Sequence, residues 1–252
     1  MVINGGSNES TCEDDPVVYG LRQQECVAQM RPLIAVITCH KNESAVQAQR
    51  DTWAKQARGI DIRFFYGIGA KRSPLPDEVF LNVLDNYSSL PHKVQHAVQW
   101  ALSHGYNGVF KCDDDAYVVP ERLSALTMRE YAGSYRAAGY MHGGAGYWLG
   151  STSLQYVARA VVEGVSEDGW VAKVLFAHKV EAYDDARLVY RRRVYRDPFP
   201  ETPTKENDLI LSAEFAPEEM LAVHKQWLGK KIDPTDNMSA AEYKKFLEPR
   251  RS

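Results

Sequence analysis

The stretch Gly108-Val109-Phe110-Lys111-Cys112-Asp113-Asp114-Asp115 decides the fold, because a short apolar strand runs directly into three consecutive carboxylates. A second run, Leu33 to Cys39, is continuously apolar, which is typical of a strand buried on both faces of a parallel sheet. Open α/β sheets place their ligands at the carboxyl ends of such strands. The two runs predict an α/β fold whose site lies at the three aspartates.

Helical and strand patterns alternate on either side of this stretch. A helix is expected from Pro91 to Gly105, because the apolar side chains between them fall on one face. Further helices are expected over Ser44 to Ala57 and Leu154 to Glu163 and from Pro120 and Pro217, and strands over Ile62 to Ile68, Lys179 to Tyr183 and Leu188 to Tyr195. The alternation predicts one layered domain over residues 31–228, between an N-terminal arm (1–30) and a polar C-terminal tail (229–252).

The composition excludes several classes of protein. Hydrophobic residues make up 44% of the 252, which is enough for a core, and a net charge of −3 gives no overall basic field for nucleic acid or a membrane. No apolar run reaches the length of a membrane span, and the polar, acidic start over Met1 to Asp15 is unlike a secretory signal. Cys39 and Cys112 are expected to be buried thiols, whereas Cys12 and Cys26 could pair only in an oxidising compartment.

Three adjacent carboxylates after a buried strand need an external partner. Repulsion and desolvation raise their pKa values, and a hard divalent cation with oxygen ligands relieves both. Such an ion can bridge the phosphates of a nucleotide and stabilise a departing diphosphate. An exposed acidic turn that caps the next helix explains the same triplet equally well, and phosphatases and polymerases also use carboxylate-bound Mg²⁺.

Several segments, taken in order, match the sequence pattern of one family. They are Gln49–Trp53 (QRDTW), Phe64–Gly67, Asp85–Lys93 (DNYSSLPHK), Phe110–Val118 (FKCDDDAYV), His142–Tyr147 (HGGAGY), Ser166–Asp168 with Trp170-Val171, and Ala216–Met220 (APEEM). Over roughly residues 32 to 228 the ordered set resembles the Fringe and β-1,3-galactosyltransferase/N-acetylglucosaminyltransferase family. The resemblance implies a GT-A fold, a nucleotide-sugar donor that is usually UDP-linked, Mn²⁺ or Mg²⁺, and inversion at the anomeric carbon.

The resemblance also implies roles for single residues. Asp115 is the expected main metal ligand, with Asp113 near the metal or the donor ribose, while Asp114 more often braces the turn. Arg50 is expected to pair with phosphate or to order the donor site, although a surface arginine on a helix explains it equally well. Trp53 is expected in the core. The residues expected around the donor are Arg50, Asp85, Lys93, Asp113, Asp114, Gly144 and Glu167.

The catalytic base implied by the resemblance lies in the pair Glu167-Asp168, and we expect it to be Asp168. Inversion is a single displacement, so the acceptor hydroxyl must lose its proton as it attacks, and a carboxylate within hydrogen-bond reach can take it. The alternative is that the pair merely starts a helix, which acids favour. On the acceptor side, glycines such as Gly146 allow close approach of a sugar, and Tyr147 and Trp148 could stack on it, although packing explains one of the two more simply.

The sequence departs from the family pattern at the third metal ligand. Many members carry a histidine just before the late P-x-x-M segment, where this chain has Ser212-Ala213-Glu214-Phe215. Glu214 could replace it as a hard oxygen ligand, His224 is a second candidate, and the third possibility is that neither binds. The base segment departs as well, with Gly169 and Ala172 in place of the family's residues.

The acceptor is expected to be a glycan, a protein or a hydroxymethylated DNA base. The last rests on a cluster of arginines, which an exposed hairpin with a solvated face also explains: Arg187, Arg191, Arg192, Arg193 and Arg196. The rival hypotheses are a non-catalytic glycan or nucleotide-sugar binding module and a phosphoryl-transfer enzyme, for which the chain lacks a P-loop or kinase motifs. The expected compartment is the cytoplasm of a bacterium or a virus-infected cell; the alternative is a Golgi-type enzyme without its anchor.

Overall fold

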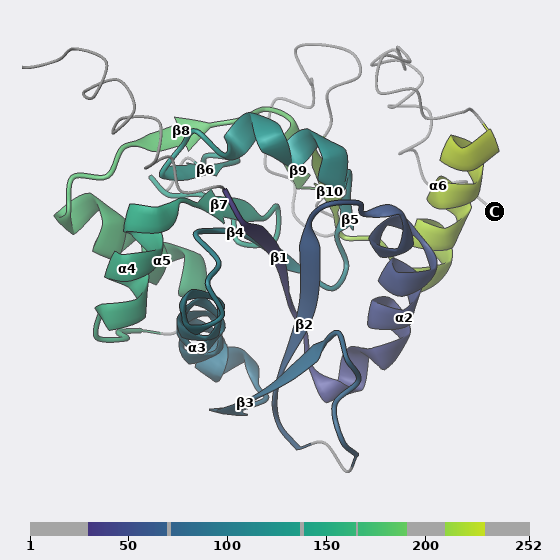
Figure 1. Cartoon of the computed structure of the whole chain (residues 1–252), viewed down its shortest axis with the longest axis horizontal. Helices are drawn as coiled ribbons and strands as arrows, with labels where there is room; N and C mark the ends of the chain where they lie inside the picture. Colours follow the sequence, from purple (N-terminus) through teal and green to yellow (C-terminus); the bar gives the residue numbers. More distant parts are fainter. Residues whose placement is uncertain (1–29, 70–71, 137–138, 165, 191–209, 230–252) are drawn as a thin grey trace, which may run out of the picture.

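A mixed sheet of seven strands forms the centre of the computed structural model, which describes residues 30–69, 72–136, 139–164, 166–190 and 210–229 (Figure 1). Across the sheet the strands are β3 (Glu78–Leu84), β2 (Asp61–Ile68), β1 (Pro32–Ile37), β4 (Gly108–Asp113), β7 (Tyr147–Leu149), β6 (Tyr131–Gly133) and β8 (Ala182–Asp184). The first four are mutually parallel, β7 is antiparallel to both neighbours, and β8 is parallel to β6. The predicted α/β class with a mostly parallel sheet is confirmed.

Helices cover both faces of this sheet (Figure 1). On one face lie α3 (Leu90–Ser103), α4 (Ser151–Arg159) and α5 (Glu167–Ala177), and on the other lie α2 (Glu43–Asp51) and α6 (Pro217–Gly229). Alternate residues of β1 supply the two cores: Leu33 and Ala35 pack with α3 to α5, whereas Ile34 and Val36 pack with α2 and α6. Burial on both faces explains why β1 reads as one continuous apolar run.

A second, three-stranded sheet joins the late part of the chain to the segment that follows the aspartates. Its strands are β5 (Tyr117–Val118), β10 (Leu211–Ala213) and β9 (Leu188–Tyr190), with β10 antiparallel to β5 and parallel to β9. Short 3₁₀ helices occur at η1 (His40–Asn42), η2 (Trp53–Gln56), η3 (Tyr87–Ser89) and η4 (Pro120–Leu126).

The predicted elements differ from the observed ones mainly at their ends. The helix expected over Ser44 to Ala57 breaks at Thr52, whose hydroxyl bonds back to the carbonyl of Ala48, and resumes as η2. The helix at Pro120 is a 3₁₀ helix, and the one expected over Leu154 to Glu163 runs from Ser151 to Arg159. The strand expected from Lys179 begins at Ala182, because Lys179 has φ +59° and turns the chain. Strands β3, β5, β6, β7 and β10 were not predicted.

Some predictions concern residues outside the described part of the chain. These are the N-terminal arm, apart from Met30, the tail beyond Gly229, and Cys12 with Cys26. Cys112 is a buried free thiol as expected, whereas Cys39, also free, is only half-buried. Within the described residues, each helix is too short or too polar to cross a bilayer.

Candidate functional site

The three aspartates form a turn at the carboxyl end of β4, closed by the amide of Ala116, which donates to the carbonyl of Asp113. Two residues of the preceding α2 and η2 fix this turn. The side-chain amide of Gln49 donates to Asp113 O at 3.0 Å and to Ala116 O at 2.8 Å, and the indole of Trp53 donates to Ala116 O at 3.0 Å. Trp53 is therefore a core residue as predicted, and its indole also donates a hydrogen bond to the turn. The role of Gln49 in fixing the turn was not predicted.

Asp114 braces the turn against the end of β1. Its Oδ2 accepts from the hydroxyl of Thr38 at 2.6 Å and from the side-chain amide of Asn42 at 2.9 Å. Burial raises its pKa to about 6, and the two hydrogen bonds oppose that rise. The structure thus supports the bracing role among the predicted ones.

Among the described residues, Asp115 has a buried carboxylate oxygen, Oδ1, that accepts no hydrogen bond. Burial, and next the charges of Asp113, Asp114 and Glu214, raise the pKa of Asp115 to about 8. A bare carboxylate oxygen beside further carboxylates is a donor set that suits a hard divalent cation. Glu214, which follows β10 with φ +66°, lies within electrostatic reach of Asp115. Its role as a metal ligand stays a prediction.

The protein does not form a complete metal cage from its own side chains. In the described ranges, no three His, Cys, Asp or Glu side chains are gathered closely enough to hold an ion together. The second candidate, His224, is occupied elsewhere: one ring nitrogen lies 2.8 Å from the hydroxyl of Tyr117 and the other lies 3.4 Å from the side-chain amide of Gln56. Because His224 is engaged elsewhere, the third ligand stays a choice between Glu214 and no protein ligand at all.

Asp113 is held by a buried lysine that the sequence did not single out. Lys111 Nζ lies 2.7 Å from Asp113 Oδ1, 3.5 Å from Glu167 Oε2 and 3.1 Å from the carbonyl oxygen of Gly143. Burial alone would lower the pKa of Lys111, but the two carboxylates outweigh it and raise that pKa, so the ammonium stays charged. The side chain of Asp113 remains 32% exposed, which leaves it within reach of a ligand.

Glu167 lies beneath this site rather than at its surface. It is buried, and it accepts a hydrogen bond from the hydroxyl of Tyr147. Burial raises the pKa of Glu167, and Lys111 opposes the rise. Glu167 therefore supports the site from within the core. Its predicted direct contact with a donor is corrected, because its carboxylate is not exposed to solvent.

Neither of the two aromatic residues expected at the acceptor has an exposed ring. Tyr147 and Trp148 are both 0% exposed. Neighbouring residues of a strand point to opposite faces, and helices cover both faces here, so Tyr147 meets Glu167 while the indole of Trp148 donates to the carbonyl of Arg129. The prediction that they stack on a sugar is corrected: both belong to the core.

Asp168 is the accessible carboxylate of the predicted base pair. It follows Ser166, the N-cap of α5, and the pair does start a helix, as the alternative interpretation proposed. Its Oδ1 accepts from the hydroxyl of Ser166 at 2.5 Å and from the amide of Gly169 at 2.9 Å, and its Oδ2 accepts from the amide of Gly143 at 3.2 Å. Arg136 Nη1 lies 3.5 Å from the same Oδ2.

The pKa of Asp168 is lowered. Burial would raise it, but the hydrogen bonds from Ser166, Gly143 and Gly169 outweigh burial. Its side chain is 14% exposed, so it can be reached from solvent. The carboxylate is therefore ionised at neutral pH, although its affinity for a proton is low.

The glycines before β7 allow their backbone to pack closely against side chains from other parts of the chain. A Cβ atom on Gly143 would lie 2.7 Å from Glu167 Oε2, and one on Gly144 would lie 2.8 Å from the ring of Tyr190. Gly146 has φ +71°, which favours glycine. Gly144 and Gly146 were predicted to make room for substrate, whereas the contacts that require them here are internal.

Asp85 and Lys93 pair with each other at the carboxyl ends of the first strands. Asp85 accepts from the amides of His40 at 2.8 Å and Gly67 at 3.0 Å and from Lys93, whose Nζ also donates to the carbonyl of Thr38 at 2.7 Å. Burial would raise the pKa of Asp85, but the bond from Lys93 and the two amides outweigh it and lower that pKa. Both residues were predicted near the donor. They connect to Asp114 through Thr38, whose carbonyl accepts from Lys93 and whose hydroxyl donates to Asp114. The pair also links β1, β2 and α3.

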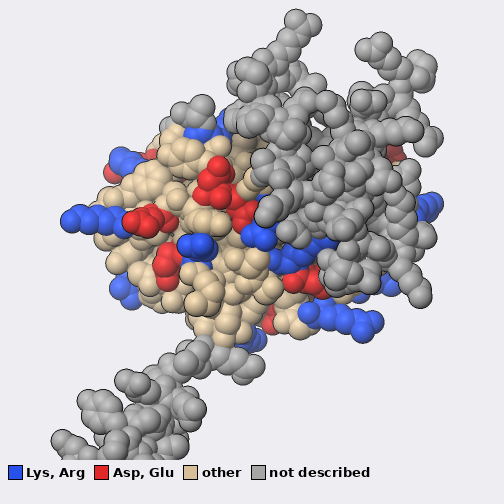
Figure 2. Space-filling view, turned by 90° about the horizontal axis from the view of Figure 1, so that it is seen from above, with Lys and Arg blue, Asp and Glu red and all other residues tan. Residues whose placement is uncertain are grey.

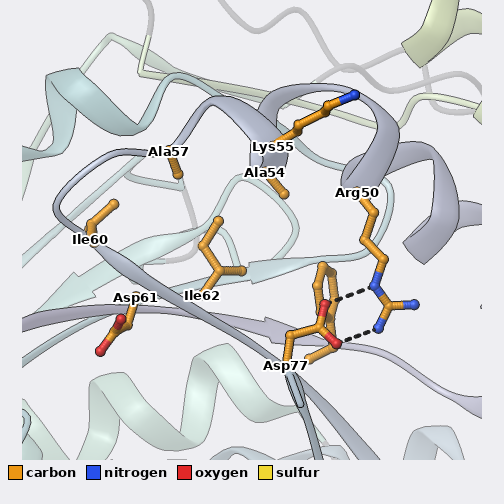
Figure 3. A pocket seen from close by; sticks show the side chains of 9 residues that line it. Arg50, Ala54, Lys55, Ala57, Ile60, Asp61, Ile62 and Asp77 are labelled. Atoms are coloured by element: carbon orange, nitrogen blue, oxygen red, sulfur yellow. Dashed lines mark hydrogen bonds and ion pairs between the residues drawn. The ribbon is translucent and has the colours of Figure 1, made fainter. Parts of the chain in front are cut away.

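Arg50 forms ion pairs with two acidic residues near the start of β3. Its guanidinium donates to Asp77 at 2.8 and 2.9 Å (Figure 3) and to Glu78 at 2.8 Å. It borders an open depression of about 340 Å³ between η2 and β2, which none of the three aspartates lines. The depression is lined by Arg50, Ala54, Lys55, Ala57, Ile60, Asp61, Ile62, Phe64 and Asp77. Arg50 thus forms ion pairs within the fold, and its pairing with phosphate stays a prediction.

The arginine cluster is described only in part. Arg187 pairs with Asp185 at 2.5 Å, and Arg191 to Arg196 lie outside the described residues. On the face seen in Figure 2, basic and acidic side chains of the described residues are interspersed. The hypothesis of a nucleic-acid acceptor stays a prediction.

Comparison with known proteins does not assign the chain to a family. No family model matches it, and no curated protein matches it either. The case for a function therefore rests on the residues and their geometry.

Proposed function

We propose that this chain is an inverting glycosyltransferase of the GT-A type that uses a divalent cation and a nucleotide-sugar donor, which the family resemblance implies to be UDP-linked. The observation that carries the proposal is the unpartnered, buried Oδ1 of Asp115 at the carboxyl end of a parallel sheet. Asp115, with Asp113 and Glu214, would hold Mn²⁺ or Mg²⁺. When bound, the ion would supply positive charge to the diphosphate leaving group.

Asp168 is the proposed general base. Its carboxylate is ionised at neutral pH and is oriented by the amides of Gly143 and Gly169. In the displacement, one of its oxygens accepts the proton of the acceptor hydroxyl as that hydroxyl attacks the anomeric carbon. Glycans, proteins and hydroxymethylated DNA bases all offer such a hydroxyl.

A non-catalytic glycan or nucleotide-sugar binding module is the second candidate, and one observation favours it. The hydrogen bonds that lower the pKa of Asp168 also make it a weak base, while efficient general bases have pKa values near the working pH. The same fold and the same metal site would serve a module that binds the donor without turning it over. Turnover separates the two candidates.

The first experiment is a thermal-shift screen of nucleotide sugars with and without Mn²⁺. A cognate donor at 100 times its Kd should stabilise the fold by about 2.7 kcal/mol, and only when the metal is present. If no nucleotide sugar raises the melting temperature in Mn²⁺, the glycosyltransferase and the nucleotide-sugar binding module both fail, and only a glycan-binding module remains.

The second experiment measures nucleotide release by the wild type and by Asp168→Asn. Loss of the base should slow release by about 10² to 10⁴-fold while the donor-induced thermal shift is retained. Asp51→Asn, a change on the exposed face of α2, serves as the matched control and should release nucleotide like the wild type. A wild type that binds donor but transfers nothing to any acceptor supports the binding module, and equal release by Asp168→Asn refutes the base.

A further inference from the structure

Lys111 is a buried cation between the metal-site carboxylates and the helix that carries the proposed base. It is 1% exposed, and its Nζ contacts one group on each side: Asp113 Oδ1 at 2.7 Å and Glu167 Oε2 at 3.5 Å. The neighbouring strand presents Tyr147 opposite it in the β4–β7 ladder, with the ring centroid 5.7 Å from Nζ. A lysine so enclosed contacts protein groups rather than a substrate.

Two contacts of Lys111, with Glu167 and with Gly143, lead to Asp168 through one further residue or bond. Glu167 is the residue before Asp168 and also accepts from Tyr147, so the first turn of α5 is fixed against β7. The carbonyl of Gly143 accepts from Lys111 at 3.1 Å, while the amide of the same glycine donates to Asp168 at 3.2 Å. One ammonium thus holds both structures that orient the Asp168 carboxylate.

We propose that Lys111 is a positioning residue, which sets the location of Asp168 relative to the donor-side carboxylate Asp113; this inference rests on the function proposed above. The same contact has a second effect. By occupying Asp113 Oδ1 with a positive charge, Lys111 competes with a divalent cation for that oxygen. Its removal should therefore strengthen cation binding while it weakens catalysis, a pair of opposite changes that simple loss of folding does not produce.

The test compares Lys111→Met with the double variant Lys111→Met/Glu167→Gln. The double variant is needed because Lys111→Met alone leaves the buried carboxylate of Glu167 without its counter-charge and risks misfolding. Lys173→Met is the matched control, since Lys173 lies on α5 and forms an exposed ion pair with Glu163, which precedes that helix. Circular dichroism and thermal melting establish that each variant is folded before it is assayed.

Two quantities are measured on the folded variants: Mn²⁺ affinity without nucleotide, by isothermal titration calorimetry, and kcat with the KM for donor. We expect Mn²⁺ to bind about tenfold more tightly, because a competing cation is gone. We expect kcat to fall by about 100-fold with the donor KM nearly unchanged, because a misplacement of about 1 Å costs that much. Lys173→Met should match the wild type in both.

The outcomes separate this inference from the proposed function. If the wild type neither binds Mn²⁺ nor transfers a sugar, the proposed function fails and the positioning role fails with it. If the wild type does both, and the folded double variant keeps the wild-type kcat or the wild-type Mn²⁺ affinity, only the role of Lys111 is overturned. If Mn²⁺ affinity and kcat fall together in proportion to the folded fraction, Lys111 is merely structural and the inference is likewise overturned.

Discussion

The side-chain amide of Gln49 donates to the carbonyl oxygen of Ala116 at 2.8 Å and to that of Asp113 at 3.0 Å, so one residue of α2 fixes both ends of the aspartate turn. The turn carries Asp115 between these two anchors. Its geometry therefore depends on a helix some sixty residues earlier in the chain, which packs on the opposite side from α5.

Replacement of Gln49 by leucine should weaken both stability and the metal site. Two buried carbonyls lose their donor, at a cost of about 1–3 kcal/mol in the free energy of unfolding, and Asp115 loses its fixed position. Urea unfolding and Mn²⁺ titration measure the two effects. Gln47→Leu, an exposed change on the same helix, is the control. Unchanged Mn²⁺ affinity in a destabilised Gln49→Leu protein would show that the turn keeps its shape without this clamp.

Asp115→Asn should stabilise the protein in EDTA and abolish its response to Mn²⁺. The wild-type carboxylate is buried beside like charges, and among the described residues its Oδ1 lacks a hydrogen-bond partner, so neutralising it removes a cost. Asp113→Asn should do the opposite in EDTA, because it takes a counter-charge from Lys111. Differential scanning calorimetry of both variants, with and without Mn²⁺, tests the contrast. A lower melting temperature for Asp115→Asn in EDTA contradicts it.

Gly143→Ala should impair turnover more than donor binding. The new Cβ would lie 2.7 Å from Glu167 Oε2 and 3.3 Å from Asp168 Cβ, so the start of α5 must move. A displacement of this kind lowers kcat by about 10²-fold. Gly59→Ala strains a backbone with φ +75° in the loop before β2 and controls for general destabilisation. Equal kcat values for the two variants would argue against a tight fit at Gly143.

The stability of the protein should decline in acid partly through Glu78. Burial would raise its pKa, but hydrogen bonds from Arg72 and Arg50 outweigh burial and lower the pKa from 4.5 to about 2. A lowered pKa in the folded state gives a stabilisation that is complete above about pH 4.5 and is lost as the pH falls toward 2, on the order of 3 kcal/mol.

Glu78→Gln provides the measurement. Urea unfolding at pH 7, 4.5 and 3 should give a flatter acid decline for the variant than for the wild type. The variant should also be less stable at pH 7, because Arg50 and Arg72 lose a charged partner. Parallel declines for the two proteins would mean that other groups account for the acid sensitivity.

The parts of the fold that the sequence predicted are those with long, regular patterns. The apolar run of β1 and the helix α3, bounded by Pro91 and Gly105, both appear close to their expected positions. Strands of two or three residues, such as β5 and β10, are too short to show a period. Strand β3 was not predicted, and its start is fixed by Glu78 and two arginines that meet it only in the folded protein.

The site was predictable where its residues follow one another and unpredictable where they meet across the fold. The aspartate turn and the helix start at Glu167 were located from local sequence. The partners of Arg50 were not, because Asp77 comes from a distant loop. Lys111 did give a signal: a lysine within an otherwise apolar, buried strand needs a carboxylate partner nearby.

The hydrogen bond from the amide of Phe215 to the carbonyl of Asp115, at 2.9 Å, has a consequence for biosynthesis. The aspartate turn is held by residues that leave the ribosome far apart in time, from Thr38 through Gln49 to Phe215. Contacts separated by so much chain form late, because the long loops must close first. A nascent chain that ends before Phe215 therefore holds its carboxylates in an unfinished turn, and capture of Mn²⁺ would report that synthesis and folding of the whole domain are complete.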